Sequence, residues 1–257
     1  MKALSIAASG MLAQQHRTEV VANNLANMNT SAYQRRRTEF NGLIYRHMTR
    51  KPSMSSRPGD SVPAGVHLGL GVKVGAVYRV QDQGALKQTG NTFDLAIQGD
   101  GYFQVQLPNG DVAYTRDGTF QLNDAGQMVT HDGFPVQPGI SVTPNAKDVS
   151  VNASGDVQVT LGDGTTATTG SLLLAMFPNP GGLEAVGDNL FVATDQSGQA
   201  AVTTPGINSA GTVMQGFVES SNVNPVEEIS NLVRASRAYE MNSKVMQAAD
   251  QMMAQRR

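Results

Sequence analysis

Hydrophobic residues recur every three to four positions through the first thirty residues of the chain. The repeat follows Leu4, Ala8, Met11, Gln15, Thr18, Ala22 and Leu25. Two of these positions are polar, but the spacing still predicts an amphipathic helix. We expect the helix to end near Asn27, because the Asn, Thr and Ser side chains of residues 27–31 compete with a helix for backbone hydrogen bonds.

A second helix is predicted from Pro225 to the end of the chain. Asn224 can cap it, and Glu227 stands three residues later, as in a capping box. Its mainly apolar face consists of two adjoining stripes. The first is Ile229, Leu232, Ser236, Tyr239, Ser243, Met246 and Met253. The second is Ala235, Ala238, Val245, Ala249 and Met252. Two stripes allow contact with two neighbours, as a bundle of several chains requires, but burial in the core of one chain explains them about equally well.

From about residue 81 the hydrophobic period changes to two. The alternating sets are Phe93, Leu95 and Ile97, then Phe103, Val105 and Leu107, then Val157, Val159 and Leu161. Turn signals separate them at Asn109–Gly110, Asp117–Gly118, Asp132–Gly133 and Asp163–Gly164. This pattern predicts a mainly antiparallel β body, built as a sandwich or an irregular barrel.

Residues 33–80 match neither pattern. Pro52, Pro58 and Pro63 interrupt helix and strand alike, so we expect an extended arm or a long loop. No acidic residue occurs from Phe40 to Gly59, a stretch that carries Arg46, Arg50, Lys51 and Arg57.

Together these patterns predict an α+β protein with three parts. Residues 1–32 and 222–257 form a discontinuous helical coiled-coil domain, in which the two ends of the chain pair. Residues 33–80 form an extended connecting segment, and residues 81–221 form a β-rich outer domain inserted between the helices. Exposed terminal helices bury little surface by themselves, so the pattern favours assembly with further chains over catalysis.

The charge is unevenly distributed along the chain. Residues 1–60 hold nine Lys and Arg against three Asp and Glu, whereas the remainder holds 10 against 18. Basic and acidic parts of neighbouring chains could therefore attract each other, although solvated faces explain the split as well. The basic residues are scattered with few aromatic neighbours, which argues against nucleic-acid binding.

No apolar run reaches the roughly 18 residues of a membrane span, and the N-terminus lacks a convincing cleavage site, so we expect neither membrane insertion nor a cleaved signal peptide.

The sequence offers no assembled catalytic, cofactor or metal site. The chain has no Cys, and its four His residues lie far apart without metal-ligand spacing. No Ser stands in a nucleophile elbow, and the Asp–Gly dipeptides serve turns. We therefore expect neither an enzyme nor a bound cofactor.

Two terminal motifs carry a resemblance. The first is Ala22-Asn23-Asn24-Leu25-Ala26-Asn27, followed by Tyr33, and the second is Ser221-Asn222-Val223-Asn224 with Arg237-Ala238-Tyr239-Glu240-Met241-Asn242-Ser243-Lys244. Together they resemble the paired signatures of bacterial flagellar axial proteins, and the chain length and the run Asp94–Phe103 resemble the distal rod members of that family. Ala32 departs from the family, which commonly has Gly there.

The resemblance implies a structural subunit of the distal rod. Such a subunit polymerises into a straight hollow drive shaft that crosses the periplasm, transmits torque to the hook and serves as an export channel. The implied partners are other copies of the chain, proximal rod proteins, hook protein, the surrounding ring proteins and the type III export apparatus, which exports the chain without cleaving a signal.

The helical periodicity and the resemblance together suggest which residues would contact other subunits. They are Leu4, Met11, Val21, Asn23, Asn24, Leu25 and Asn27 at one end, and Val226, Ile229, Leu232, Val233, Tyr239, Val245, Met246, Met252 and Met253 at the other. Arg46, Arg50, Lys51 and Arg57 would stiffen the rod by fixing the connecting segment between subunits. The alternatives are another axial protein, such as hook or proximal rod, or a secreted β-domain enzyme or glycan-binding protein with a helical stalk.

Overall fold

The chain forms two compact units in the computed structural model, which describes residues 2–43, 45–47, 67–143 and 146–255. The helical unit comprises Met1–Ala26, Arg36–Arg79 and Asn224–Arg257, and the β body comprises Asn27–Arg35 and Val80–Val223. A helix at each end of the chain and a mainly antiparallel β body between them confirm the predicted α+β class. Of the connecting segment, the described residues within Arg36–Arg79 belong to the helical unit, whereas residues 33–35 and Val80 belong to the β body.

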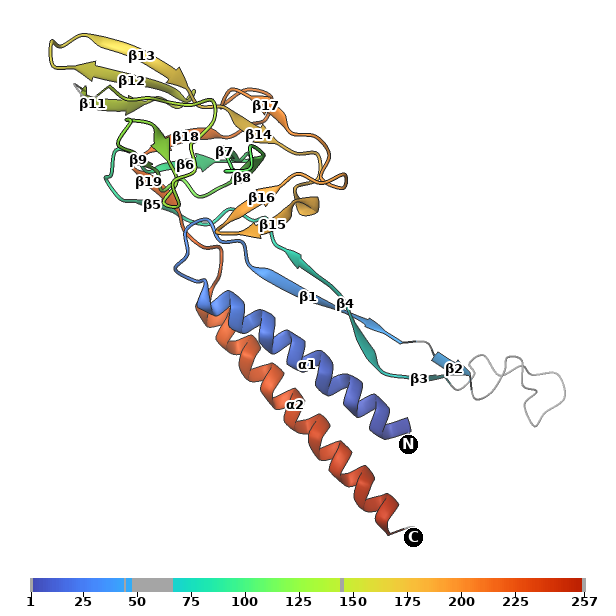
Figure 1. Cartoon of the computed structure of the whole chain (residues 1–257). Helices are drawn as coiled ribbons and strands as arrows, with labels where there is room; N and C mark the ends of the chain where they lie inside the picture. Colours follow the sequence, from blue (N-terminus) through green and yellow to red (C-terminus); the bar gives the residue numbers. More distant parts are fainter. Residues whose placement is uncertain (1, 44, 48–66, 144–145, 256–257) are drawn as a thin grey trace, which may run out of the picture. The chain divides into compact units, whose positions relative to one another are not determined.

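The helical unit consists of two long helices and a narrow β-ribbon. Helix α1 (Lys2–Ala26) lies beside α2 (Pro225–Ala254), and the two run in opposite directions (Figure 1). Strand β1 (Arg36–Gly42) pairs antiparallel with β4 (Val72–Arg79), and both contact α1. The short strands β2 (Tyr45–His47) and β3 (His67–Gly69) form a second antiparallel pair.

The helix ends follow the predicted local chemistry. Helix α1 ends at Ala26, and the Thr30 amide then donates to the Asn27 carbonyl in a turn. At the start of α2, the Asn224 side chain accepts hydrogen bonds from the amides of Val226 and Glu227 at 3.1 and 3.4 Å. This cap satisfies two amides that have no partner within the helix.

The β body is built from many short strands in several small sheets. A four-stranded sheet has the order β15-β16-β8-β7, from β15 (Glu184–Gly187), β16 (Leu190–Val192), β8 (Val112–Thr115) and β7 (Phe103–Gln106). A three-stranded sheet joins β11 (Ala146–Val151), β12 (Asp156–Leu161) and β13 (Thr166–Ser171). Four further sheets have two strands each: β18 (Thr212–Gln215) with β6 (Leu95–Gln98), β19 (Phe217–Glu219) with β5 (Leu86–Gln88), β14 (Leu174–Met176) with β17 (Ala201–Thr203), and β9 (Gln121–Leu122) with β10 (Met128–Val129). A short 3₁₀ helix, η1, spans Pro180–Gly182.

The period-two residues point into a common core. Phe103, Val105, Val157 and Val159 are all buried there, as the alternation predicts. Among the turn signals, Asp117–Gly118 has a different role. Gly118 does not adopt a positive φ; instead, a side chain at this position would collide with the Leu95 carbonyl, so Gly is required for the close approach of two backbones.

Candidate assembly surface

The contact between α1 and α2 is made by small and polar side chains. A Cβ atom on Gly10 would lie 2.9 Å from the Asn242 side-chain nitrogen, so the helices approach closely at this point. Arg17 donates to the Asn231 side chain at 3.3 Å. Of the described residues in the helical unit, the buried apolar ones are Ala7, Ala13, Val21, Ala235 and Ala249. Four of these five are alanines, so small side chains make up most of the fully buried apolar residues of the unit.

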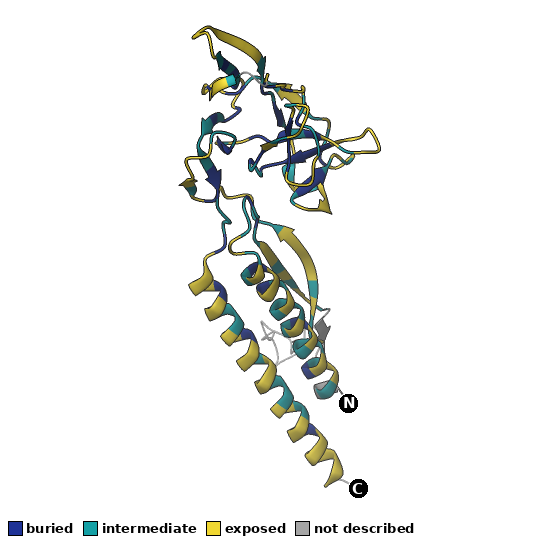
Figure 2. Cartoon of the chain, turned by 60° about the vertical axis from the view of Figure 1, so that its left-hand side comes forward, coloured by how far each residue is buried: buried dark blue, intermediate teal, exposed yellow. Residues whose placement is uncertain are grey.

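Several large apolar side chains of α2 are exposed to solvent, whereas Leu232 and Met246 are half-buried. Figure 2 shows α2 exposed along most of its length, with buried residues at only a few positions. Val226, Ile229 and Val233 form a first exposed patch, and Met241, Val245 and Met252 form a second. At 100° per residue, the first patch lies opposite the buried positions Ala235 and Ala249, and the second lies about a quarter turn away from the first.

The residues expected to contact other subunits differ in their exposure to solvent. On α2, Val226, Ile229, Val233, Tyr239, Val245, Met252 and Met253 are exposed, whereas Leu232 and Met246 are half-buried. On α1, Leu4, Met11 and Leu25 are half-buried, Asn23 is exposed, and Val21 and Asn24 are buried within the chain. Asn27 is half-buried in the turn after α1.

Sequence reasoning missed two exposed apolar residues on the helices. Leu12 and Met241 are 56% and 60% exposed, the latter within the second patch. Neither residue belongs to the hydrophobic repeats of three to four residues that predict the helices. They are recognised only once the structure shows a large apolar side chain exposed on the helix surface.

The basic residues of the connecting segment can be placed only in part. Arg46 lies in β2, where its backbone pairs with Leu68. Arg50, Lys51 and Arg57 lie outside the described residues.

Two asparagines of the terminal motifs bind backbone rather than solvent. Asn24 is 1% exposed and forms two hydrogen bonds with the main chain of Arg36, each 2.8 Å long. Asn222 accepts from the Arg35 amide at 2.7 Å and donates to the carbonyls of Val80 and Asp82. Asn24 thus ties β1 to α1, and Asn222 joins three segments of the β body.

No three His, Cys, Asp or Glu residues in the described part of the chain are grouped closely enough to hold a metal ion. Neither described helix combines the length and apolar character needed to cross a bilayer.

Comparison with known proteins identifies the family. Residues 4–34 match the family described as flagella basal body rod protein, residues 96–159 match the flagellar hook protein FlgE/F/G D1 domain, and residues 214–255 match the flagellar basal body rod FlgEFG protein C-terminal region. The chain is 52% identical to the flagellar basal-body rod protein FlgG of Caulobacter vibrioides, covering 98% of this chain and 97% of that protein. The chain belongs to the flagellar basal-body rod protein family.

Other rod proteins match over the same extent. FlgG of Agrobacterium fabrum is 44% identical and FlgG of Bacillus subtilis is 31% identical, each covering 98% of this chain and 97% of the relative. Membership of this family confirms the expected role as a structural protein of the flagellar basal body in motility.

Ala32 stands where the family commonly has Gly, and its backbone conformation is one that suits glycine. Ala32 is buried and has φ +54°, in the left-handed region that glycine enters without steric cost. Its amide donates to the Glu219 carbonyl at 2.8 Å, which holds the strained residue in place.

Glu219 also forms a buried ion pair. Its carboxylate lies 2.9 Å from both Nε and Nη2 of Arg116, and the two side chains are 4% and 7% exposed. The other carboxylate oxygen accepts from the Gly84 amide at 3.0 Å. Arg116 completes its bonding with the carbonyls of Gly99 and Gly101, so the pair links segments of the β body that are distant in sequence.

Proposed function

We propose that this protein is a subunit of the distal rod and polymerises helically into a straight, hollow drive shaft. The observation that carries the proposal is the orientation of α2. The fully buried apolar residues of α2 are small, while two patches of large apolar side chains on the same helix remain exposed. Exposed apolar patches on a helix indicate a contact with another molecule, and two patches allow contact with two neighbours.

In this proposal, the terminal helices of neighbouring subunits pack as coiled coils and line the shaft, and the β body faces outward. The shaft crosses the periplasm, transmits torque to the hook and serves as an export channel. Its partners are proximal rod proteins, hook protein, the ring proteins and the type III export apparatus, which exports the chain without cleaving a signal. A match over nearly the whole length to FlgG proteins supports a rod subunit over the alternative of a hook subunit.

Charged substitutions in the two patches test the proposal. Ile229 and Val245 are 50% and 52% exposed, so Ile229→Asp and Val245→Asp should leave the single chain folded. Burying either carboxylate in a helix contact would cost several kcal/mol, and polymerisation should fail. Gln247→Asp adds the same charge at an exposed polar position of α2 and serves as the control.

Sedimentation and negative-stain microscopy of the purified proteins would give the answer. The wild type and Gln247→Asp should form straight tubes, and the two patch variants should remain soluble. Normal tubes from both patch variants would show that these patches do not join subunits.

The stiffening role of the connecting segment has its own test. The segment's basic residues, including Arg46, could fix it against the acidic part of an adjacent chain by charge-assisted contacts. Deleting about residues 47–64 should then leave export and polymerisation intact but give a curved polymer. Straight polymers from this deletion would contradict the stiffening role.

A further inference from the structure

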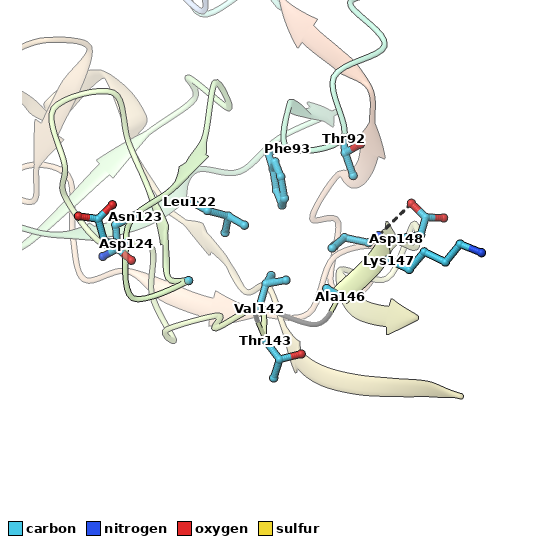
Figure 3. A pocket seen from close by; sticks show the side chains of 12 residues that line it. Thr92, Phe93, Leu122, Asn123, Asp124, Val142, Thr143, Ala146, Lys147 and Asp148 are labelled. Atoms are coloured by element: carbon cyan, nitrogen blue, oxygen red, sulfur yellow. Dashed lines mark hydrogen bonds between the residues drawn. The ribbon is translucent and has the colours of Figure 1, made fainter. Parts of the chain in front are cut away.

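The β body contains an open hollow of about 440 Å³, and Phe93, Leu122 and Val142 are among the residues that line it (Figure 3). The Asp148 carboxylate at its edge accepts from the Val149 amide at 2.9 Å. None of its described lining residues has a buried polar side-chain atom without a partner, so this lining offers no free buried group to hold a ligand. Specific polar contacts occur instead where the β-ribbon meets α1.

The β-ribbon formed by β1 and β4 is tied to α1 at both ends. At one end, the Asn24 side chain bonds the amide and the carbonyl of Arg36, each at 2.8 Å. At the other end, Ser9 Oγ accepts from the Val72 amide at 3.3 Å and donates to the Ile6 carbonyl at 2.7 Å. Fifteen positions of α1 separate the two ties and span about 22 Å, while the seven residues of β1 span about 23 Å. The spacing of the ties therefore matches the length of the ribbon.

The two ties differ in strength. Asn24 is 1% exposed and makes two short bonds, so breaking them would leave a buried amide group without partners. Ser9 is half-buried and holds the ribbon by a single bond, which is longer than most N–H···O bonds in proteins. The Ser9 end of the ribbon should therefore open more readily than the Asn24 end.

A β-bulge divides the ribbon between the two ties. Glu39 pairs with Ala76, but the next residue, Phe40, pairs with Val74, so Gly75 has no residue opposite it. A bulge interrupts the ladder and bends the strand, and glycine has the greatest freedom of backbone rotation. We call residues 36–39 and 76–79 the proximal half of the ribbon, and residues 40–42 and 72–74 the distal half.

The close approach at the Ser9 tie requires glycine. Gly71 has φ +117°, which residues with a side chain rarely adopt, and a Cβ at this position would collide with Ser9 Oγ. The Gly71 carbonyl also accepts from the Leu43 amide at 2.8 Å, which extends the pairing of the distal half. One hydroxyl and one glycine thus bring the distal half against α1.

The ribbon has little support from side-chain burial. No residue of β1 or β4, both of which the structure describes in full, is buried. Segments that bury few side chains open locally at a low cost in free energy. The distal half continues into β2 and β3, so its position sets the direction in which the chain leaves α1.

We propose that the ribbon is a hinged strap, in which Ser9 is the latch and Gly75 is the hinge. When the latch opens, the distal half leaves α1 while Asn24 keeps the proximal half in place. The consequence rests on the proposed rod function: a straight polymer needs the same conformation in every subunit, and closed latches supply it. A mixture of open and closed straps would let subunits on the two sides of a curve differ, so the polymer would bend.

Amide hydrogen exchange of the full-length monomer tests the hinge. In the wild type, the distal half should exchange faster than the proximal half. Ser9→Ala should speed exchange of the distal half about fivefold, the effect of losing one hydrogen bond, and leave the proximal half unchanged. Thr18→Ala is the control, because the Thr18 hydroxyl donates to the Gln14 carbonyl within α1. Nine positions at 3.6 residues per turn also place Thr18 on the face of α1 opposite Ser9.

A second variant tests whether Ser9 and Gly71 form one latch. Gly71→Ala should speed exchange of the distal half, because its new Cβ pushes against Ser9 Oγ. Combined with Ser9→Ala, it should add less than its separate effect, because both changes break the same contact. Effects that multiply fully would show that the two residues do not act together.

Negative-stain microscopy of the polymers tests the consequence for the rod. Ser9→Ala should polymerise at the same protein concentration as the wild type, because the exposed patches of α2 are unchanged, but its tubes should bend. Tubes of Thr18→Ala should stay straight.

The outcomes separate the strap from the rod function. Equal exchange of the two halves in the wild type, or equal acceleration of both halves in Ser9→Ala, would overturn the strap. Straight tubes from Ser9→Ala would overturn its role in the rod, even where exchange shows that the strap opens. Absence of polymer from the wild type would overturn the rod function, and the exchange result alone would then decide the strap.

Discussion

Removing the carboxylate of Glu219 should destabilise the β body by about 3–5 kcal/mol, the usual cost of breaking a buried ion pair. Glu219 is the acidic partner of Arg116, and both side chains are almost fully buried. In Glu219→Ala the guanidinium would keep only the carbonyls of Gly99 and Gly101, and its charge would stay in a low-dielectric site. The Gly84 amide would also lose its acceptor, which by itself costs about 1–3 kcal/mol.

Two further variants identify the source of the loss. Glu219→Gln keeps an oxygen for the Gly84 amide but removes the charge, so its loss should be smaller than that of Glu219→Ala. Asp82→Ala breaks the Arg35–Asp82 pair, whose atoms are 3.8 Å apart and whose Asp82 side chain is 76% exposed. This exposed pair should contribute less than about 1 kcal/mol.

Urea unfolding followed by the β-sheet circular dichroism would measure all three variants. Differences in midpoint at a shared slope give the change in free energy of unfolding. A loss of less than about 1 kcal/mol in Glu219→Ala, or a loss no larger than that of Asp82→Ala, would show that the buried ion pair does not stabilise the β body.

Two other predictions concern the β body. Ala32 has a left-handed backbone conformation that a β-branched side chain would strain further. In thermal unfolding, Ala32→Val should therefore lose about 1–3 kcal/mol of stability, whereas Ala32→Gly should stay within about 1 kcal/mol of the wild type. Equal stability of the two variants would contradict the strain argument. Burial raises the pKa of Tyr114 above its ordinary value of 10.0, so the unfolded chain loses this proton first as the pH rises. The free energy of unfolding should therefore fall above about pH 10, and Tyr114→Phe should show a shallower fall in urea unfolding measured across that range; identical profiles would refute the assignment.

Local signals predicted the ends of the helices well. The Asn224 cap and the end of α1 before Asn27 depend on residues close together in sequence, so the sequence alone contains the relevant chemistry. The same holds for the alternation in β7 and β12, where every second side chain enters the core.

The packing partners of the helices could not be predicted in the same way. The predicted second stripe includes Ala235 and Ala249, which are buried, but the pattern of apolar residues does not mark the close contact of Gly10 with the Asn242 side chain. Small residues contact each other only when two backbones approach closely, and that approach depends on the whole unit. The Arg116–Glu219 pair joins residues 103 positions apart, and nothing in the local sequence connects them.

In the proposed rod, the exposed patches of α2 become buried between subunits. A single cysteine introduced as Val245→Cys would report this directly, because the chain has no other thiol to react. The rate of thiol alkylation should be high in the monomer, where Val245 is 52% exposed, and should fall sharply in the polymer. Equal alkylation rates in monomer and polymer would show that the α2 surface remains open to solvent after assembly and that the patches do not join subunits.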